Sequence, residues 1–143
     1  MSRGEKKIKE YLKSINIDFE REKTFPELRG YNNGLLRFDF CININEDEQD
    51  FLFVEFDGEQ HFEKVQWSSK DTDDIINTRF ELTQRHDRIK NRFCKVYDYP
   101  LLRNRYDEIK DIDDLLDKFL NDPRGYVYSR LTPLERWKLL NCK

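Results

Sequence analysis

Apolar residues near the start of the chain follow a helical period. Three of them recur at positions i, i+4 and i+7: Ile8, Leu12 and Ile15. This spacing places them on one face of an α-helix, and Ser2 followed by Glu5 has the spacing of a capping box. The pattern predicts an amphipathic helix over residues 2–16, with the carboxylate of Glu5 on the side of the apolar face.

The segments that follow have the patterns of strands and turns. Residues 18–25 alternate weakly and stop before Pro26, which predicts a short edge strand. The Gly and Asn residues of 29–34 predict a hairpin turn. Residues 35–44 and 50–58 are rich in aromatic and β-branched residues, and they predict two adjacent antiparallel central strands.

The second half of the chain returns to helical spacing and then alternates with a strand. Residues 73–93 follow Thr72, a capping residue, and predict a long helix. Its apolar stripe consists of Ile75, Leu82, Ile89 and Phe93. Residues 99–106 predict a buried strand, residues 111–120 a second helix, and a capping box at 132–135 a last short helix.

The order of these elements predicts an α/β fold. A long helix falls between predicted strands, which is typical of a mixed central β-sheet flanked by helices. At 143 residues the chain has the length of one domain. We expect a single domain over residues 1–143, in which residues 107–143 form a C-terminal helical extension.

The composition is polar but supplies a core. Charged residues make up 38% of the chain and hydrophobic residues 37%, while eleven Phe, seven Tyr and two Trp provide bulky apolar surface. The formal net charge of -3 argues against a protein that coats nucleic acid without specificity, although a carboxylate-rich centre can mask basic patches elsewhere.

Cysteine usage and the N-terminus bear on location. The three cysteines form no CxxC pair, which argues against a disulfide framework and a structural zinc site and fits a reducing cytoplasm. The N-terminus is charged, and no run approaches the ~20 apolar residues that a membrane span requires. We therefore expect an intracellular, cytoplasmic protein with no membrane partner.

Acidic residues interrupt the two predicted central strands. Glu55 and Asp57 are two apart, so they share a face of one strand about 6.6 Å apart along the backbone, and Asp39 can join them from its neighbour. An acid in an apolar strand is often a satisfied buried carboxylate or an edge-strand gatekeeper. Three on adjacent strands repel one another unless a cation neutralises them, and their hard oxygen atoms suit Mg²⁺, with Mn²⁺ as a substitute.

A divalent ion held in this way predicts hydrolytic chemistry. It can lower the pKa of bound water and stabilise the charge that develops on a phosphodiester's phosphorus, which is what cleavage of nucleic acid needs. His61 follows the second strand and can position water or protonate a leaving oxygen.

Several short motifs, in order, resemble the Vsr-like branch of the PD-(D/E)XK nucleases. They are Glu5 in the first helix, RFDF at 37–40, VEFDGEQHF at 54–62, RHDRIKNRFC at 85–94 and PLLR at 100–103. This branch includes very short patch repair endonucleases and some phage homing endonucleases. The resemblance covers about residues 2–106, and EFDGEQH is its most specific part.

The resemblance implies a restriction-endonuclease-like sheet and a role for each acid. Asp39 would be the central metal-binding aspartate, with Glu55 and Asp57 on the strand that follows. Four further residues would support the centre: Gln60, His61, Glu5 and Asp87. The first two complete the centre, and the two acids order metal-bound water or a catalytic side chain.

The chain departs from the commoner pattern of this superfamily. Asp57 stands where Lys is usual, so the group that activates water stays open between His61 and Lys90. Glu5 is equally explained as a first-turn acid that favours the helix dipole, and Asp87 as a solvated helix charge.

Basic residues and one aromatic residue predict a surface that meets DNA. The cations gather on the long helix and the strand after it, where they can contact phosphates, although a solvated helix face explains them equally. The aromatic residue lies in a loop, where it can wedge between bases or cap the core. The predicted contact residues are Arg85, Arg88, Arg92, Arg103 and Trp67. His86, on the stripe of the same helix, is either a packed residue or a supporting site residue.

These expectations combine into a Mg²⁺-dependent endonuclease that hydrolyses DNA phosphodiester bonds. Its catalytic residues would be Asp39, Glu55, Asp57, His61, Glu5 and Asp87, with Asp39, Asp57 and Glu55 on the metal. Two alternatives remain: a non-cleaving nucleic-acid-binding module of the same fold, and a metal-dependent hydrolase of small phosphoesters. A homodimer is compatible with the sequence but is not derivable from it.

Overall fold

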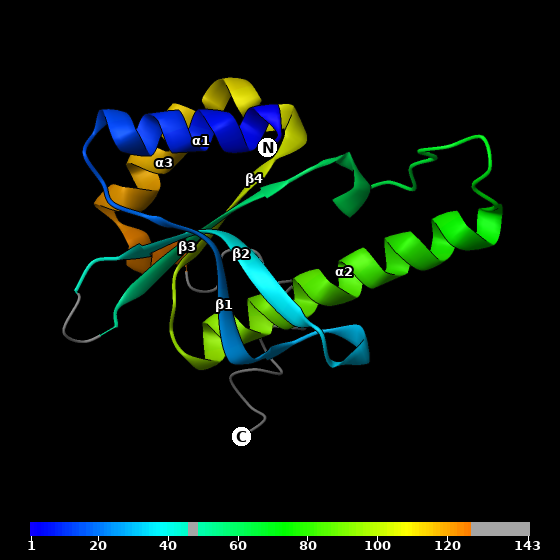
Figure 1. The fold of residues 1–143 in the computed structure, drawn as a ribbon. Coiled ribbons are helices and arrows are strands. Elements are labelled where there is room, and N and C mark those ends of the chain that lie inside the picture. Colours follow the sequence, from blue (N-terminus) through cyan, green and yellow to red (C-terminus); the bar gives the residue numbers. More distant parts are fainter. Residues whose placement is uncertain (46–48, 127–143) are drawn as a thin grey trace.

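The computed structural model describes residues 1–45 and 49–126 of the chain (Figure 1). In chain order the helices and strands are α1 (Arg3–Ser14), β1 (Glu20–Arg29), β2 (Leu35–Asn43), β3 (Phe51–Asp57), α2 (Asp73–Val96), β4 (Leu101–Arg105) and α3 (Ile112–Asn121). A short 3₁₀ turn, Glu59–His61, follows β3 directly. No helix of the described ranges is both long enough and apolar enough to cross a membrane.

The strands form one mixed sheet in the order β1-β2-β3-β4. β1 pairs antiparallel with β2, and β2 antiparallel with β3, whereas β3 and β4 are parallel. A parallel pair needs a crossover connection, and α2 lies in the one between β3 and β4. The structure thereby confirms the predicted α/β class, a mixed central sheet flanked by helices.

Helices cover both faces of this sheet. α1 and α3 lie together on one face and α2 lies on the other (Figure 1). The buried cluster under α1 and α3 contains Ile8, Leu12, Phe40, Ile42, Leu52, Val54, Leu102, Ile112, Leu116 and Phe119. The cluster under α2 contains Leu28, Leu36, Phe38, Cys41, Phe51, Phe53, Phe93, Cys94 and Leu101. The buried residues of α2 all lie near its C-terminal end, so its first turns extend beyond the sheet.

The side chains of β2 depart from regular alternation between the two faces of the sheet around Asp39. Phe38 belongs to the cluster under α2 and Phe40 to the cluster under α1, although residues two apart in a regular strand share a face. Opposite this point on β1, Glu22 has a left-handed φ of 52°. The pairing of β2 with β3 runs only from Asn43 to Phe40, so the two strands part at Asp39.

Most of the predicted elements are confirmed, and two details are wrong. The first strand does not stop before Pro26 but continues to Arg29, because an edge strand tolerates a residue without a backbone N–H. The predicted stripe of the long helix fails at Ile75, which is 46% exposed because the start of α2 lies beyond the sheet. The helix predicted at 132–135 lies outside the described residues.

The first turn of α1 is fixed at both its cap and its contact with the sheet. The predicted capping box is present: Glu5 N–H donates to Ser2 Oγ at 3.2 Å, and Ser2 N–H donates to Glu5 Oε2 at 3.0 Å. Gly4 lies so close to the ring of Phe56 that a Cβ atom would overlap it. The start of α1 is therefore docked against the end of β3.

This contact predicts that Gly4→Ala destabilises the protein. Helix propensity alone would favour alanine by about 1 kcal/mol, but the overlap with Phe56 should lower the free energy of unfolding by about 1–3 kcal/mol. Urea unfolding measures the difference. The control is Gly34→Ala, whose Cβ would meet only Tyr31 O at 3.9 Å. A Gly4→Ala protein as stable as Gly34→Ala would contradict the close packing.

Candidate active site

Asp39 occupies the point where β2 leaves β3. Its Oδ2 accepts a hydrogen bond from the Phe56 backbone N–H at 2.8 Å, in place of the strand pairing that ends two residues earlier on β3. Arg21, on β1, donates from Nε to the Asp39 carbonyl oxygen at 2.9 Å. Side chain and backbone are thus both held, and the carboxylate is aimed into the gap between the two central strands.

Glu55 forms a carboxylate pair with Asp39. Glu55 is only 3% exposed, and its carboxyl group lies beside that of Asp39. Burial, together with the negative charge of Glu55 and a hydrogen bond to it, raises the pKa of Asp39 to about 9. Lys90 of α2 approaches the pair from the other side and donates from Nζ to Glu55 Oε1 at 2.9 Å.

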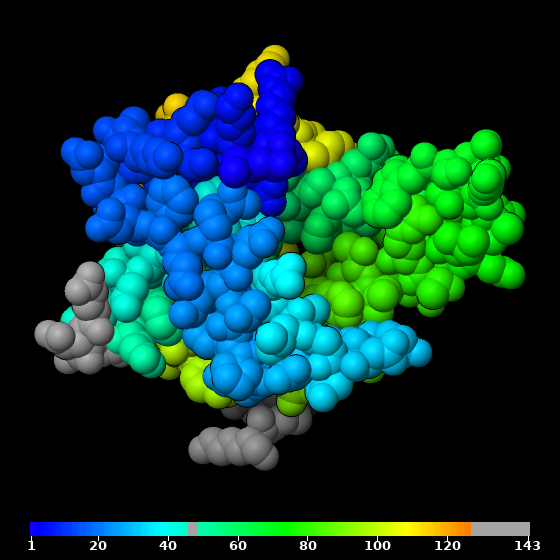
Figure 2. All heavy atoms as spheres, viewed as in Figure 1, coloured from blue at the N-terminus to red at the C-terminus, as the bar shows by residue number. Residues whose placement is uncertain are grey.

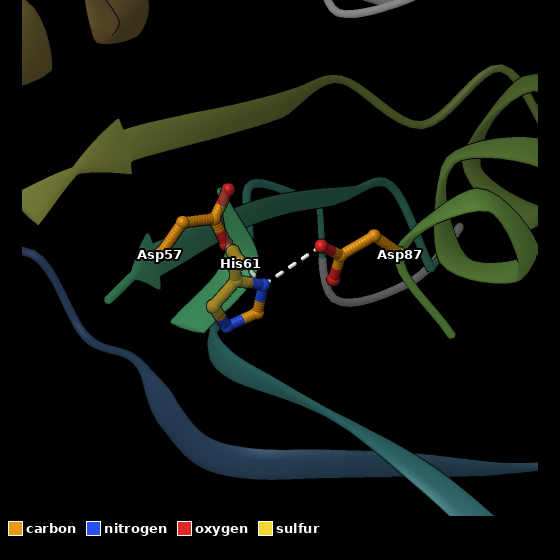
Figure 3. A group of neighbouring side chains, drawn as sticks. All are labelled: Asp57, His61 and Asp87. Atoms are coloured by element: carbon orange, nitrogen blue, oxygen red, sulfur yellow. Dashed lines mark hydrogen bonds and ion pairs between the residues drawn. The ribbon is translucent and has the colours of Figure 1, made fainter. Parts of the chain in front are cut away.

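A second group lies where β3 ends. His61 Nδ1 and Asp87 Oδ2 are 2.7 Å apart, and Asp57 Oδ1 is 3.7 Å from the same nitrogen (Figure 3). These three side chains come from the 3₁₀ turn, α2 and β3, and each offers one ligand atom within 4.8 Å of the others. Such a set can hold a metal ion, and its mixed nitrogen and oxygen donors are not specific for Mg²⁺.

Arg103 fills the interior side of this second group. It is 5% exposed, and its Nη1 lies 2.8 Å from Asp57 Oδ1 and 3.6 Å from Asp87 Oδ1. Nε donates to Asn91 Oδ1 at 2.9 Å and Nη2 to the Asp87 carbonyl oxygen at 3.3 Å. We predicted that Arg103 contacts DNA, and this is wrong: β4 runs parallel beside β3, which buries its guanidinium against acids.

Arg103 also changes the expected role of Asp57. Asp39, Glu55 and Asp57 do not gather as one three-ligand group, since the group that the described residues form is the one around His61. Burial raises the pKa of Asp57, and the charges of Arg103 and His61 oppose that shift. A buried arginine at 2.8 Å offsets the charge of Asp57, which weakens the attraction of this carboxylate for an added cation.

The neighbours of His61 change the pKa of its imidazole. Burial by itself would lower the pKa of the imidazole, but the hydrogen bond to Asp87 and the charges of Asp57 and Asp87 raise it overall. Because Nδ1 is engaged by Asp87, the Nε2 atom remains for exchange of a proton with another molecule.

The other predicted site residues fall at different distances from these two groups. Glu5 lies beside the carboxylate pair, since its charge adds to the pKa rise of Asp39 and its Oε1 is 3.7 Å from Arg21 Nη2. Gln60 folds back against Gly58, where a Cβ atom would come within 2.5 Å of its Oε1. His86 accepts the Tyr31 N–H through Nε2 at 3.2 Å, so it anchors the β1–β2 turn to α2.

The predicted DNA-contacting residues other than Arg103 are at the surface. Three of them lie on exposed positions of α2: Arg85, Arg88 and Arg92. Trp67 is 63% exposed, and the guanidinium of Arg79 lies 4.0 Å from the centre of its ring. The indole is therefore held on the outer part of α2 and is not a cap on the core.

Two residues that shape the site were not predicted from the sequence. Asn91 lies four residues after Asp87 on α2, and this spacing, which puts both on one helix face, was a readable signal. Arg21 had no comparable signal, because its position beside Asp39 depends on the register of β1 against β2.

Comparison of the chain with protein-family models, with curated proteins and with solved structures gave no significant match. The functional argument therefore depends on the geometry of the described side chains and on the motifs in the sequence. The resemblance to Vsr-like nucleases stays a prediction.

The raised pKa of Asp39 predicts how the metal-free stability changes with pH. In the unfolded chain this group titrates near 3.8, and in the folded protein near 9. The folded state therefore binds the proton more tightly, so the free energy of unfolding should fall as the pH rises between these values. Asp39→Asn removes the titration and should raise the melting temperature at pH 8 in EDTA by about 2–6 °C.

Asp113→Asn on the exposed side of α3 serves as the matched control for this measurement. The two variants and the parent protein should differ little at pH 5, where Asp39 is protonated in the folded state. In EDTA, the melting temperature of the parent should fall from pH 5 to pH 8 relative to that of Asp39→Asn. A parent whose melting temperature rises relative to that of Asp39→Asn over this range would contradict the raised pKa of Asp39.

Proposed function

We propose that this protein is a metal-dependent endonuclease that hydrolyses DNA phosphodiester bonds, as a member of the Vsr-like PD-(D/E)XK group. The observation that carries the proposal is the Asp39–Glu55 pair beside Lys90, in which burial and the charge of Glu55 raise the pKa of Asp39 to about 9. The motif order across residues 2–106 and the mixed α/β sheet support it.

The residues fit a hard divalent cation at the carboxylate pair. Asp39 and Glu55 supply oxygen donors that repel each other without a cation, and a bound Mg²⁺ or Mn²⁺ would displace the proton that the raised pKa keeps on Asp39. When bound, such an ion supplies charge stabilisation for the phosphodiester and a nucleophilic water. Lys90, whose Nζ lies 2.9 Å from Glu55 Oε1, adds a positive charge that would help to stabilise a bound phosphate.

His61 is positioned to move a proton on the same face of the sheet. Glu55 and Asp57 are two apart on β3, which separates their Cα atoms by about 6–7 Å, and His61 contacts Asp57. Its raised pKa increases the imidazolium fraction near neutral pH, which favours donation of a proton to the leaving oxygen.

Behind His61, a buried frame fixes its orientation. Arg103 binds both Asp57 and Asp87, and Asn91 binds Arg103. Removing one partner of a buried ion pair typically costs about 3–5 kcal/mol, so substitutions in this frame act on folding as well as on activity. Asp87 bridges the frame and the histidine, as an orienting partner of His61.

Cleavage of supercoiled plasmid in Mg²⁺ tests the proposal. The parent protein should nick or linearise the plasmid, EDTA should stop the reaction, and Asp39→Ala should reduce the rate by at least about 100-fold. The control Asp113→Ala should cleave as the parent does. Binding of DNA without cleavage by the parent would indicate the non-cleaving module, and hydrolysis of nitrophenyl phosphate without cleavage of DNA would indicate a small-phosphoester hydrolase.

The pairing of His61 with Asp87 predicts a shift in the pH–rate profile. The hydrogen bond and charge of Asp87 raise the pKa of His61, so Asp87→Asn should move the limb that reports this histidine to lower pH. The rate at neutral pH should fall by about 10- to 100-fold, and His61→Ala should abolish the limb. Asp74→Asn, in the first turn of the same helix, is the control. An unchanged limb in Asp87→Asn would rule out this coupling.

A further inference from the structure

The outer face of α1 carries a row of basic residues that the proposed site does not use. The helix has five basic and two acidic residues among its 12, within a chain whose formal net charge is -3. At about 100° per residue, four of the cations fall within roughly a third of the helix circumference. This basic row consists of Arg3, Lys6, Lys9 and Lys13.

The charges of the basic row are not neutralised by their surroundings. Among the described residues, none of the four side chains makes a hydrogen bond or an ion pair, and Glu10 is the acid on the same face. Some other cations are paired with acids: Lys23 pairs with Glu20 and Arg105 with Asp107. Uncompensated positive charge on one face attracts a polyanion.

The row forms a surface that is open to a partner. Lys6, Lys9 and Lys13 line a hollow of about 410 Å³, together with Met1 and Glu10. The opposite side of the helix, with Ile8 and Leu12, is fully buried in the core, which fixes the direction of the row. In Figure 2 the dark blue atoms of α1 lie uncovered along the top of the molecule.

The basic row lies on the helix that brings Glu5 to the candidate site. The carboxylate of Glu5 lies beside Arg21 and Asp39, and Lys6 is the next residue on α1. From Lys6 to Lys13 the helix rises about 10 Å, which equals roughly three phosphates along one DNA strand. The row lies over the sheet face opposite α2, whose exposed arginines were predicted to contact DNA.

We propose that the basic row of α1 binds the phosphate backbone of the DNA substrate on one side of the scissile bond, while the α2 arginines contact the other side. This inference rests on the proposed function, because it assigns the substrate path through the same site. The contact is to phosphates and reads no sequence. It adds affinity and salt dependence but contributes nothing to the chemical step.

Fluorescence anisotropy with a labelled DNA duplex tests the row, with Ca²⁺ in place of Mg²⁺ to neutralise the carboxylate pair. Lys13→Glu should weaken binding about fivefold or more at about 50 mM salt. Lys118→Glu is the matched control, since both lysines are exposed in the last turn of a helix, and its effect should stay below about twofold. The triple variant Lys6→Gln, Lys9→Gln, Lys13→Gln should reduce the slope of log K against log salt by about 2–3.

The outcomes separate this inference from the proposed function. Equal binding by Lys13→Glu and Lys118→Glu, or no binding of DNA by the parent, would overturn the inference whatever the plasmid assay shows. The same variant can be tested on vesicles of anionic phospholipid. If Lys13→Glu lost binding to the vesicles but kept its binding to DNA, the inference would also be overturned. If Lys13→Glu bound DNA more weakly than the parent while the parent did not cleave plasmid, the role of the basic row would be supported and the nuclease activity refuted.

Discussion

The hydrogen bond from the Phe56 backbone to Asp39 is the contact on which the arrangement of the site depends. β2 and β3 cease to pair at Phe40, and the N–H of Phe56 would lose its partner if the Asp39 carboxylate did not take it. A buried N–H left without an acceptor costs about 1–3 kcal/mol. The same side chain thus closes the sheet and lies beside Glu55.

Two acids of β3, Glu55 and Asp57, have different partners and therefore different proposed roles. Glu55 and Asp57 are each 3% exposed and lie two positions apart, yet Asp57 is bound by the buried Arg103 while Glu55 lies between Lys90 and Asp39. Arg103 offsets the charge of Asp57. Lys90 offers one positive charge to the two carboxyl groups of Asp39 and Glu55, so this pair needs a further proton or cation and is the better candidate for a metal site.

The two basic surfaces supply the positive charge that the proposed binding of DNA requires. The chain is acidic overall, so its field alone does not attract DNA. The cations instead gather on α1 and on α2, which cover opposite faces of the sheet and flank the point where β2 and β3 separate. Their attraction is local, and it decreases as salt screens the phosphates.

Hydrophobic periodicity by itself determined the helices, the central antiparallel strands and the α/β class. The spacing of apolar residues such as Ile8 and Leu12 follows the helical period of 3.6, and the apolar segment around Phe53 has the pattern of a strand. It also placed Glu55 and Asp57 on one face of a strand. Only the tertiary structure decided that Arg103 lies inside rather than on DNA, that Asp57 is bound to it, and that Arg21 supports Asp39. These outcomes depend on β4 lying parallel to β3 and on the register of β1 with β2, and such contacts between residues distant in the chain leave no local period in the sequence.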